Sequence, residues 1–349
     1  KIENTTSDAI QVRNYETISR DNNSTASMML PTYTGSAFYD EENKFSKLSF
    51  DDIFNNKQTI KTKDSWISMI EHYFFSAWLP TSSKQRIIYT NYENNIYTIG
   101  SSTNYQSIDT NQSGSFKSLM YVGPKLQSEI SNLTAGLDLT VDYGVLTFLS
   151  APLFWILDSI NYIFDNWGLS IIILTILIKA VFFKLSESSY RSMAQMKKLN
   201  PRMQALKERY AEDKKKFSEA LMRMYKEEKV NPLGGCLPIL IQIPVFIALY
   251  WVLVESIEIR HAPFFGWIHD LSSADPYFIL PIAMGVSMYI QQKLNPAPTD
   301  PTQQKIFMFL PFIFTALFAT FPSGLVLYWL TNNVLSIAQQ YVINKRIVG

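Results

Sequence analysis

Apolar and polar residues are distributed unevenly along the chain, with the boundary near residue 145. Residues 1–145 are rich in Asn, Ser, Thr and Tyr, whereas most apolar runs of helical length follow that point. Five runs are long enough, or nearly so, to cross a hydrocarbon layer that needs about 20 helical residues. They lie near 166–186, 233–256, 276–293, 304–321 and 323–343. The pattern predicts a polar domain followed by a five-span α-helical membrane core over 166–349.

The polar half alternates short runs of β-branched and aromatic residues with turn formers. Arg86–Tyr92 and Ile96–Gly100 flank an Asn-containing turn, which is typical of a β-hairpin. We therefore expect an antiparallel β domain over residues 1–136. Lys1 opens within strand-like sequence, without an initiator Met or a signal peptide, so we expect the natural chain to begin upstream.

Residues 137–165 join the two halves and contain one amphipathic stretch. Its apolar positions are 149, 153, 156, 160 and 163, while Asp158, Asn161 and Asp165 lie elsewhere. This spacing predicts a helix that lies in the outer membrane–water interface rather than crossing the bilayer. A linker helix packed on the polar domain is the alternative.

Charge predicts the orientation, because Lys and Arg collect on the cytoplasmic side of membrane proteins. Between Lys184 and Val230 there are 13 Lys and Arg against 7 Asp and Glu, whereas Arg260 is the single Lys or Arg of the loop 259–275. The basic loop is therefore expected in the cytoplasm. Alternation then places residues 1–165 outside and the C-terminal tail inside.

The basic loop, 187–230, has a helical pattern with a turn at Tyr210–Asp213 and a helix start at Asn200 and Pro201. Apolar residues of the two arms face one another across the hairpin: Met203, Leu206 and Tyr210 against Phe217, Leu221 and Met224 or Tyr225. They fill the seam of a two-helix hairpin. Alternatively, the methionines and the basic excess form a docking arm for ribosomal RNA or anionic lipid. The candidate docking residues are Met203, Arg209, Tyr210, Lys214, Lys215 and Lys216.

One cation, Lys179, lies inside the first apolar run. A lysine near a helix centre costs about 2.5–3.5 kcal/mol on insertion scales, against roughly 0.3–0.6 returned by each large apolar neighbour. Its ammonium either snorkels to the interface or lines a water-filled groove. Thr175 lies one turn earlier, and Gln242 lies between two prolines of the next run. No carboxylate lies inside any run, since Glu255 is at the end of one, and these three observations favour the groove.

The remaining side chains disfavour several function classes. A single cysteine, Cys236, excludes an internal disulfide and a cysteine metal cluster. His261 and His269 lie in the outer loop, which argues against an intramembrane protease. A secondary transporter or channel would use intramembrane carboxylates or paired half-helices. We expect no enzyme activity, no cofactor, no metal and no small-molecule substrate.

Several stretches resemble the YidC membrane protein insertases. They are, in chain order, YVGPKL (121–126), LDLTVDYG (137–144), EEKVNPLGGCLPILIQIPVF (227–246), WIHDLSSADPYFILP (267–281) and FPSGLVLYW (321–329). The resemblance implies a β-sandwich periplasmic domain, partial here, then five core helices and a cytoplasmic hairpin. It also implies location in the inner membrane of a Gram-negative bacterium.

The same resemblance implies a function and a site. The family inserts nascent membrane proteins and helps them to fold, alone or with the Sec translocon, and receives them from the ribosome. It places a cation, commonly Arg, at the position of Lys179, in a hydrophilic groove open to the cytoplasm and to the lipid bilayer. Thr175, Gln242, Tyr328 and Trp329 match positions that line this groove or contact substrate. A role as a chaperone alone is left open.

Overall fold

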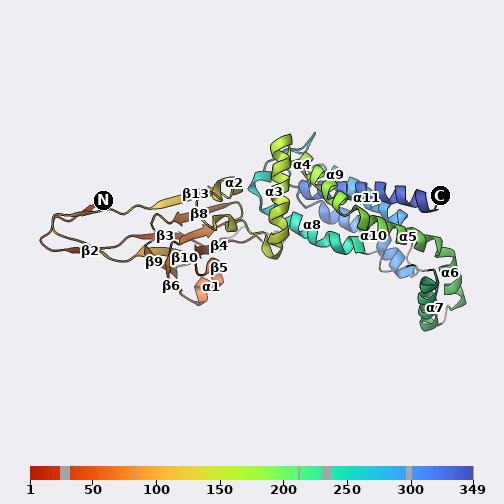
Figure 1. Cartoon of the computed structure of the whole chain (residues 1–349), viewed down its shortest axis with the longest axis horizontal. Helices are drawn as coiled ribbons and strands as arrows, with labels where there is room; N and C mark the ends of the chain where they lie inside the picture. The colour runs from red at the N-terminus through yellow and green to blue at the C-terminus, as the bar shows by residue number, and fades with distance from the viewer. Residues whose placement is uncertain are drawn as a thin grey trace. The chain divides into compact units, whose positions relative to one another are not determined.

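The computed structural model describes all residues except 24–31, 83, 211–212, 229, 231–236, 296–300 and 349. The chain divides into two units, one built from strands and one from helices (Figure 1). The first unit comprises Lys1–Asp142 and Glu255–Glu258. The second comprises Tyr143–Val254 and Ile259–Gly349.

Antiparallel strands build the first unit, as the sequence predicted. A five-stranded sheet has the order β13-β8-β7-β4-β5, and a four-stranded sheet has the order β3-β10-β9-β6. Their bounds are β3 Tyr15–Arg20, β4 Gly35–Asp40, β5 Lys44–Leu48, β6 Thr59–Lys63, β7 Trp66–Ile70, β8 Phe74–Leu79, β9 Gln85–Glu93, β10 Ile96–Thr103 and β13 Leu119–Pro124. Two short pairs join β1 (Ile2–Glu3) to β12 (Ser113–Gly114) and β2 (Ile10–Val12) to β11 (Gln106–Ile108).

Both large sheets contribute to one apolar core. Phe38 and Ile67 from the five-stranded sheet join Ile88 and Ile99 from the four-stranded sheet in one buried cluster. Helix α1 (Phe50–Asn55), which begins with a capping box at Ser49, adds two more side chains to it. Two sheets that face each other across a shared core form a β-sandwich.

The β9–β10 hairpin confirms the sequence prediction for this segment. Buried and partly exposed residues alternate along β9, and the two strands pair from Glu93 with Ile96 to Arg86 with Thr103. Asn94 and Asn95 both have positive φ angles, 52° and 62°. A two-residue turn of this hand matches the twist of the strands, and Asn tolerates it better than most residues.

Two ion pairs are buried among the described residues of the first unit. Arg86 Nη1 of β9 is 2.7 Å from Glu16 Oε2 of β3, and both side chains are less than 5% exposed. Lys125 Nζ is 3.8 Å from Glu255 Oε2, with both side chains 1% exposed. Burial lowers the pKa of Lys125 to about 8, while the Glu255 carboxylate opposes that shift. The first pair ties two strands of one sheet together.

Helices build the second unit. After the short turn η2 (Gly144–Leu146), they are α3 Thr147–Phe164, α4 Trp167–Val181, α5 Phe183–Lys198, α6 Asn200–Arg209, α7 Lys214–Glu227, α8 Leu237–Glu255, α9 Ile279–Leu294, α10 Pro301–Phe318 and α11 Ser323–Val348. Residues 319–322 connect α10 to α11, where the Pro/Gly turn was predicted. Figure 1 shows α3 lying across the direction of α8, α10 and α11.

The first predicted span ends earlier than the sequence pattern indicated. We expected a helix over 166–186, but α4 ends at Val181 and α5 leaves it at an angle of 69°. Phe182 and Phe183 continue the apolar run, so hydrophobicity alone gives no stop signal. A side chain of α11 reaches the bend, since Gln339 Nε2 donates to the Phe183 carbonyl at 3.2 Å. Contacts of this kind are a recognised cause of kinks.

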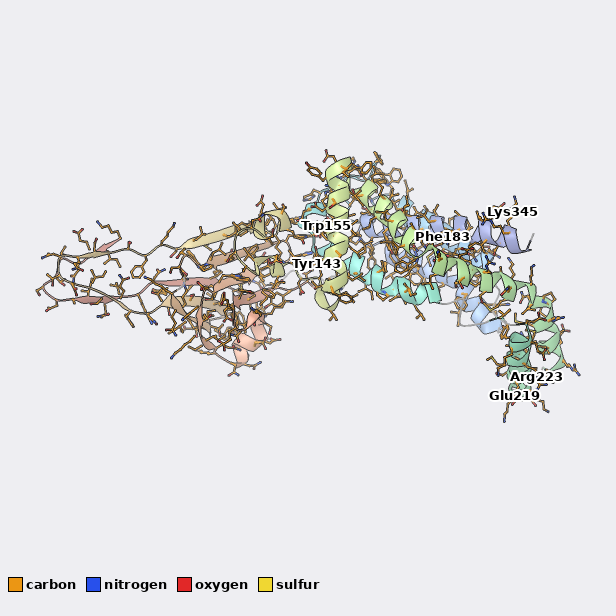
Figure 2. The ribbon with its side chains drawn as sticks, viewed as in Figure 1. Tyr143, Trp155, Phe183, Glu219, Arg223 and Lys345 are labelled. Carbon is orange, nitrogen blue, oxygen red and sulfur yellow. The ribbon has the colours of Figure 1, made fainter. Side chains whose placement is uncertain are left out.

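Among the described residues, one helical segment is both long and apolar enough to cross a membrane by itself, Gly144–Phe164. The pair α4 and α5 meets the same criterion only if the two bent helices are counted as one span, and Leu240–Glu255 and Gln304–Phe318 are apolar but shorter. The segment Gly144–Phe164 contains the helix that the sequence assigned to the interface. Its buried residues include Leu153, Leu157 and Ile160, whereas Trp155 is 70% exposed (Figure 2).

The loop between α8 and α9 fixes the starts of α9 and α11. Asp275 accepts from Trp267 Nε1 at 3.0 Å and from the Leu280 amide at 2.7 Å. The Ser323 amide donates to Ser273 at 2.7 Å, and the Gly324 amide donates to Leu271 at 2.9 Å. A Cβ at Gly324 would approach the Leu271 carbonyl oxygen to 3.2 Å, so a larger residue would weaken this contact. These bonds give a structural role to the WIHDLSSADPYFILP and FPSG stretches.

The buried pair in the four-stranded sheet generates a stability prediction. Glu16→Gln leaves the Arg86 guanidinium buried without its counterion, which typically costs about 3–5 kcal/mol. We expect hydrogen exchange of the β9 and β10 amides to accelerate by two or more orders of magnitude in the full-length protein. Glu71→Gln, which breaks the exposed pair of Glu71 with Arg20, is the control, at roughly 0–1 kcal/mol. Equal protection of these amides from hydrogen exchange in both variants would contradict a stabilising role of the buried pair.

Candidate functional site

Lys179 lies in the last turn of α4 rather than at the centre of a long helix. This position lowers the cost of its charge, because cations near a helix C-terminus interact favourably with the helix dipole. The side chain is 8% exposed, and Nζ donates to Ser336 Oγ of α11 at 2.7 Å. No carboxylate of the described residues forms an ion pair with it. The ammonium is therefore directed toward α11.

Ser336 connects Lys179 to the rest of α11. Its hydroxyl donates to the Asn332 carbonyl at 2.7 Å. Tyr190 of α5 is also buried and interacts with the same serine side chain. Ser336 is itself 1% exposed, so the lysine, the serine and the tyrosine form a buried polar group among apolar helices. Each polar atom in such a place needs a partner, because water cannot replace it.

Three further side-chain bonds link α11 to α8 and α9. Gln242 Nε2 of α8 donates to Asn332 Oδ1 at 3.0 Å. On the α9 side, Asn333 Nδ2 donates to Ser287 Oγ at 3.0 Å. Further along, Gln340 Nε2 donates to Asn295 Oδ1, also at 3.0 Å. Together with the bond between Ser336 and Lys179 of α4, these bonds connect α11 to three neighbouring helices. We call Asn332, Asn333, Ser336, Gln339 and Gln340 the α11 polar strip.

A pocket of about 440 Å³ opens between α8, α9, α10 and α11. Its residues are Gln242, Ile243, Phe246, Met288, Gln291, Gln292, Asn295, Phe307, Leu310, Pro311, Phe314, Tyr328, Trp329, Asn332 and Asn333. Part of the lining is aromatic, and we call it the aromatic side: Trp329 meets Phe246 edge-on with ring centroids 4.7 Å apart, and stacks with Phe314 at 6.3 Å. Another part consists of side-chain amides, which we call the amide side: Gln242, Gln291, Gln292, Asn295, Asn332 and Asn333. No Asp, Glu, Lys, Arg or His belongs to this described lining.

The structure brings together three of the five groove residues predicted from the sequence. Gln242, Tyr328 and Trp329 line the pocket, whereas Thr175 and Lys179 do not. Thr175 is buried, and its hydroxyl donates to the Ile171 carbonyl at 2.6 Å, within its own helix. Lys179 reaches the pocket only indirectly, through Ser336 and Asn332.

Sequence reasoning missed the α11 polar strip. Asn332, Ser336 and Gln340 recur every fourth residue inside an otherwise apolar run, so they share one helix face. That spacing was a usable signal, because polar residues in membrane segments face the protein interior. Their partners on α4, α8 and α9 lie at least 45 residues away in the chain, so local pattern does not identify them.

The helical hairpin, α6 and α7, has most of the seam that the sequence predicted, but Tyr210 and Phe217 do not belong to its buried cluster. Met203 and Met224 belong to a buried cluster with Leu199 and Val230, and Leu206, Leu221 and Tyr225 pack against it. Met203 is only 4% exposed, so burial removes it from the candidate docking surface. Leu199, not Asn200, caps α6, and Pro201 lies in its first turn as expected.

The basic residues at the hairpin tip lie outside that seam. Lys215 and Lys216 are exposed, whereas the side chain of Lys214 lies outside the described residues. The Arg209 guanidinium stands 5.7 Å from the Tyr210 ring centroid. Asp213 caps α7, and the hydrogen bonds it accepts from Lys216 lower its pKa. Figure 2 shows Arg223 and Glu219 on α7.

The fold and the site define a class of membrane protein, in which a β-sandwich domain precedes a helical core with a polar pocket. The family model described as YidC periplasmic domain matches residues 1–156, and the one described as 60Kd inner membrane protein matches residues 159–349. The chain belongs to the YidC family of 60Kd inner membrane proteins.

Curated relatives carry the name Membrane protein insertase YidC. The protein from Methylobacillus flagellatus is 52% identical over 347 residues, which cover 99% of this chain and 63% of that protein. The protein from Alkalilimnicola ehrlichii is 53% identical over 317 residues, covering 90% and 56%. The chain thus spans about three fifths of the length of these relatives.

A solved structure shares the fold. It is described as an active YidC insertase crystal structure with the first transmembrane domain resolved. The likeness has a TM-score of 0.51 at 20% identity, over 88% of this chain and 83% of that chain. At this identity the likeness supports the fold and not the details of the site.

The Lys179–Ser336 bond generates the second prediction. Ser336→Ala should destabilise the protein by about 1.5–3 kcal/mol, because a buried ammonium loses its acceptor. In a Lys179→Met background the same change should cost much less. Thermal unfolding of the four purified proteins in detergent gives the coupling.

Ser287→Ala is the matched control for this cycle, since Ser287 is also a buried serine but binds Asn333. Its effect should be the same with Lys179 and with Met at that position. An equal cost of Ser336→Ala in both backgrounds would show that the lysine does not depend on Ser336.

Proposed function

We propose that this chain is the working part of a membrane protein insertase and chaperone, which inserts nascent proteins into the inner membrane and helps them to fold. Membership of the YidC family supports the proposal, together with the names of relatives near 50% identity. The observation that carries it is a pocket with one amide side and one aromatic side among apolar helices. Such a site accepts polar and apolar parts of one polypeptide and contains no reactive group.

The proposed topology has five spans, α4, α8, α9, α10 and α11, with α3 in the outer interface. The basic excess of 184–230 supports a cytoplasmic position of the hairpin, on the same side as the Lys345 end of α11. The crosswise direction of α3 supports its interfacial position (Figure 1). At 15 and 16 residues, α4 and α9 rise only about 22–24 Å. A bilayer of about 30 Å would have to thin around them.

Thinning of the bilayer and the polar pocket would both lower the free-energy barrier to moving a hydrophilic substrate tail through hydrocarbon. The hydrophilic tail of a substrate must leave water, and each unpaired peptide group costs several kcal/mol in hydrocarbon. A hydrated pocket that reaches partway across shortens the apolar path. Lys179 adds a positive potential to this region, where the effective dielectric is lower than that of water. Acidic tails would benefit most, and no nucleotide hydrolysis is required by this scheme.

The proposed partners follow from the surfaces of the second unit. Nascent membrane proteins and lipid contact the pocket and the apolar helix faces. The ribosome or anionic lipid contacts the basic tip, through Arg209, Tyr210 and Lys214–Lys216. A partnership with the Sec translocon rests on the family resemblance alone.

The test of this function is insertion of a single-span substrate into proteoliposomes that contain each Lys179 variant. Lys179→Ala should impair substrates with acidic tails by roughly tenfold, since charges about 10 Å apart at an effective dielectric near 20 interact by about 1.7 kcal/mol and this attraction is lost. Lys179→Glu should impair them most, because it replaces the attraction with a repulsion of similar size and so doubles the change in free energy. Lys179→Arg keeps the charge and is the control, with nearly unchanged insertion.

Substrates with tails of different charge distinguish an electrostatic role of Lys179 from a lysine that only snorkels. Neutral tails should respond weakly, and basic tails should insert better with Lys179→Glu than with the parent. If the lysine only snorkels, Lys179→Ala should be neutral or stabilising for every tail. Equal efficiency of Lys179→Glu across acidic, neutral and basic tails would rule out the electrostatic role. No insertion above protein-free liposomes by the parent would overturn the insertase proposal itself.

A further inference from the structure

The amide side of the pocket contains six primary amides and no charged group among the described residues. It comprises Gln242, Gln291, Gln292, Asn295, Asn332 and Asn333. Each primary amide offers two donor hydrogens and an acceptor oxygen with two lone pairs. Six such groups around one pocket provide many donors and acceptors and no net charge. A site built for a charged group would instead carry an opposite charge.

The bonds among the described residues leave part of this capacity unused. The bond from Gln242 to Asn332 uses one donor of the first side chain and one lone pair of the second. The bond from Asn333 to Ser287 uses one donor hydrogen. Gln292 Oε1 is buried and accepts no hydrogen bond from the described residues. This acceptor is open to a donor from outside the protein, either water or an N–H group of a ligand.

An extended polypeptide presents the groups that this side lacks. Each peptide unit has one N–H and one C=O, and in hydrocarbon an extended segment leaves them unpaired, whereas a helix satisfies its own. An acyl chain would suit the aromatic side but would leave the amides unpaired. Side-chain amides bind peptide groups whatever the neighbouring side chains are, which suits a protein with many substrates.

We propose that this pocket binds the main chain of a substrate segment while it is extended, through the side-chain amides of α8, α9 and α11. The inference rests on the proposed insertase function and names the substrate chemistry of its site. Lys179 lies outside the pocket lining, so charge and main chain are recognised by different residues. Once the segment becomes helical, its N–H groups bind its own carbonyls and it leaves the amides.

The test uses synthetic single-span peptides whose tails differ only in the main chain. One peptide has an all-amide alanine tail, and the other has esters at alternate tail positions, which remove N–H donors and keep side chains and trans geometry. The full-length protein in proteoliposomes should insert the ester peptide more slowly, by about two- to tenfold for each hydrogen bond lost. Protein-free liposomes should show the opposite order, because fewer donors are desolvated.

Pocket variants locate the effect. Gln242→Leu and Gln292→Leu should each reduce the difference between amide and ester tails, whereas Met288→Leu, an apolar change in the same pocket, should preserve it. The comparison of the two peptides with the parent protein needs no variant, so a folding defect in a variant does not obscure it.

The outcomes distinguish this inference from the function on which it rests. If the parent does not accelerate insertion of the amide peptide, the insertase proposal fails. If it accelerates both peptides equally, or the ester peptide more, the insertase proposal stands and main-chain recognition is overturned. That result would assign the pocket to an acyl chain or to apolar side chains.

Discussion

The helical core depends on the requirement that polar groups among apolar helices be hydrogen-bonded. Helix α11 contains five polar residues between Asn332 and Gln340, and the proposed topology places it in the bilayer, where lipid offers these residues no partner. Four of these five residues form hydrogen bonds with side chains of other helices. Asn332 bonds to α8, Ser336 to α4 and Asn333 to α9, while Gln340 bonds to Asn295 at the end of α9. Gln339 reaches the bend between α4 and α5. The strip therefore determines which helices meet α11 and in what register.

The same requirement explains why a lysine is tolerated in α4. Its charge is placed in the last helical turn, next to a bend and against a serine, rather than in a continuous apolar helix. The short α4 shifts that turn toward the membrane surface in the proposed topology. The charge lies close enough to the pocket to influence it, while the lining itself remains uncharged. This arrangement separates long-range attraction of charge from short-range binding of polar groups.

Much of the fold could be predicted from the sequence, because it depends on local pattern. Alternation and an Asn turn predicted β9 and β10, and apolar runs predicted α8 to α11 to within a few residues at the described ends. The end of α4 could not be predicted, since Phe182 and Phe183 extend the apolar run and the bend involves a contact with Gln339. The separation of Lys179 from the pocket also depends on tertiary contacts, so spacing within one helix did not reveal it.

The proposed mechanism requires that water reach the amide side of the pocket from the cytoplasm and not from the periplasm. Labelling of Asn332→Cys with a membrane-impermeant maleimide, in a Cys236→Ser background, measures this access. Phe312→Cys, on the exposed apolar face of α10, is the lipid-facing control and should remain unlabelled. We expect rapid labelling of Asn332→Cys in inside-out vesicles and protection in right-side-out vesicles. Labelling from the periplasmic side, or none from either side, would contradict a pocket that opens to the cytoplasm.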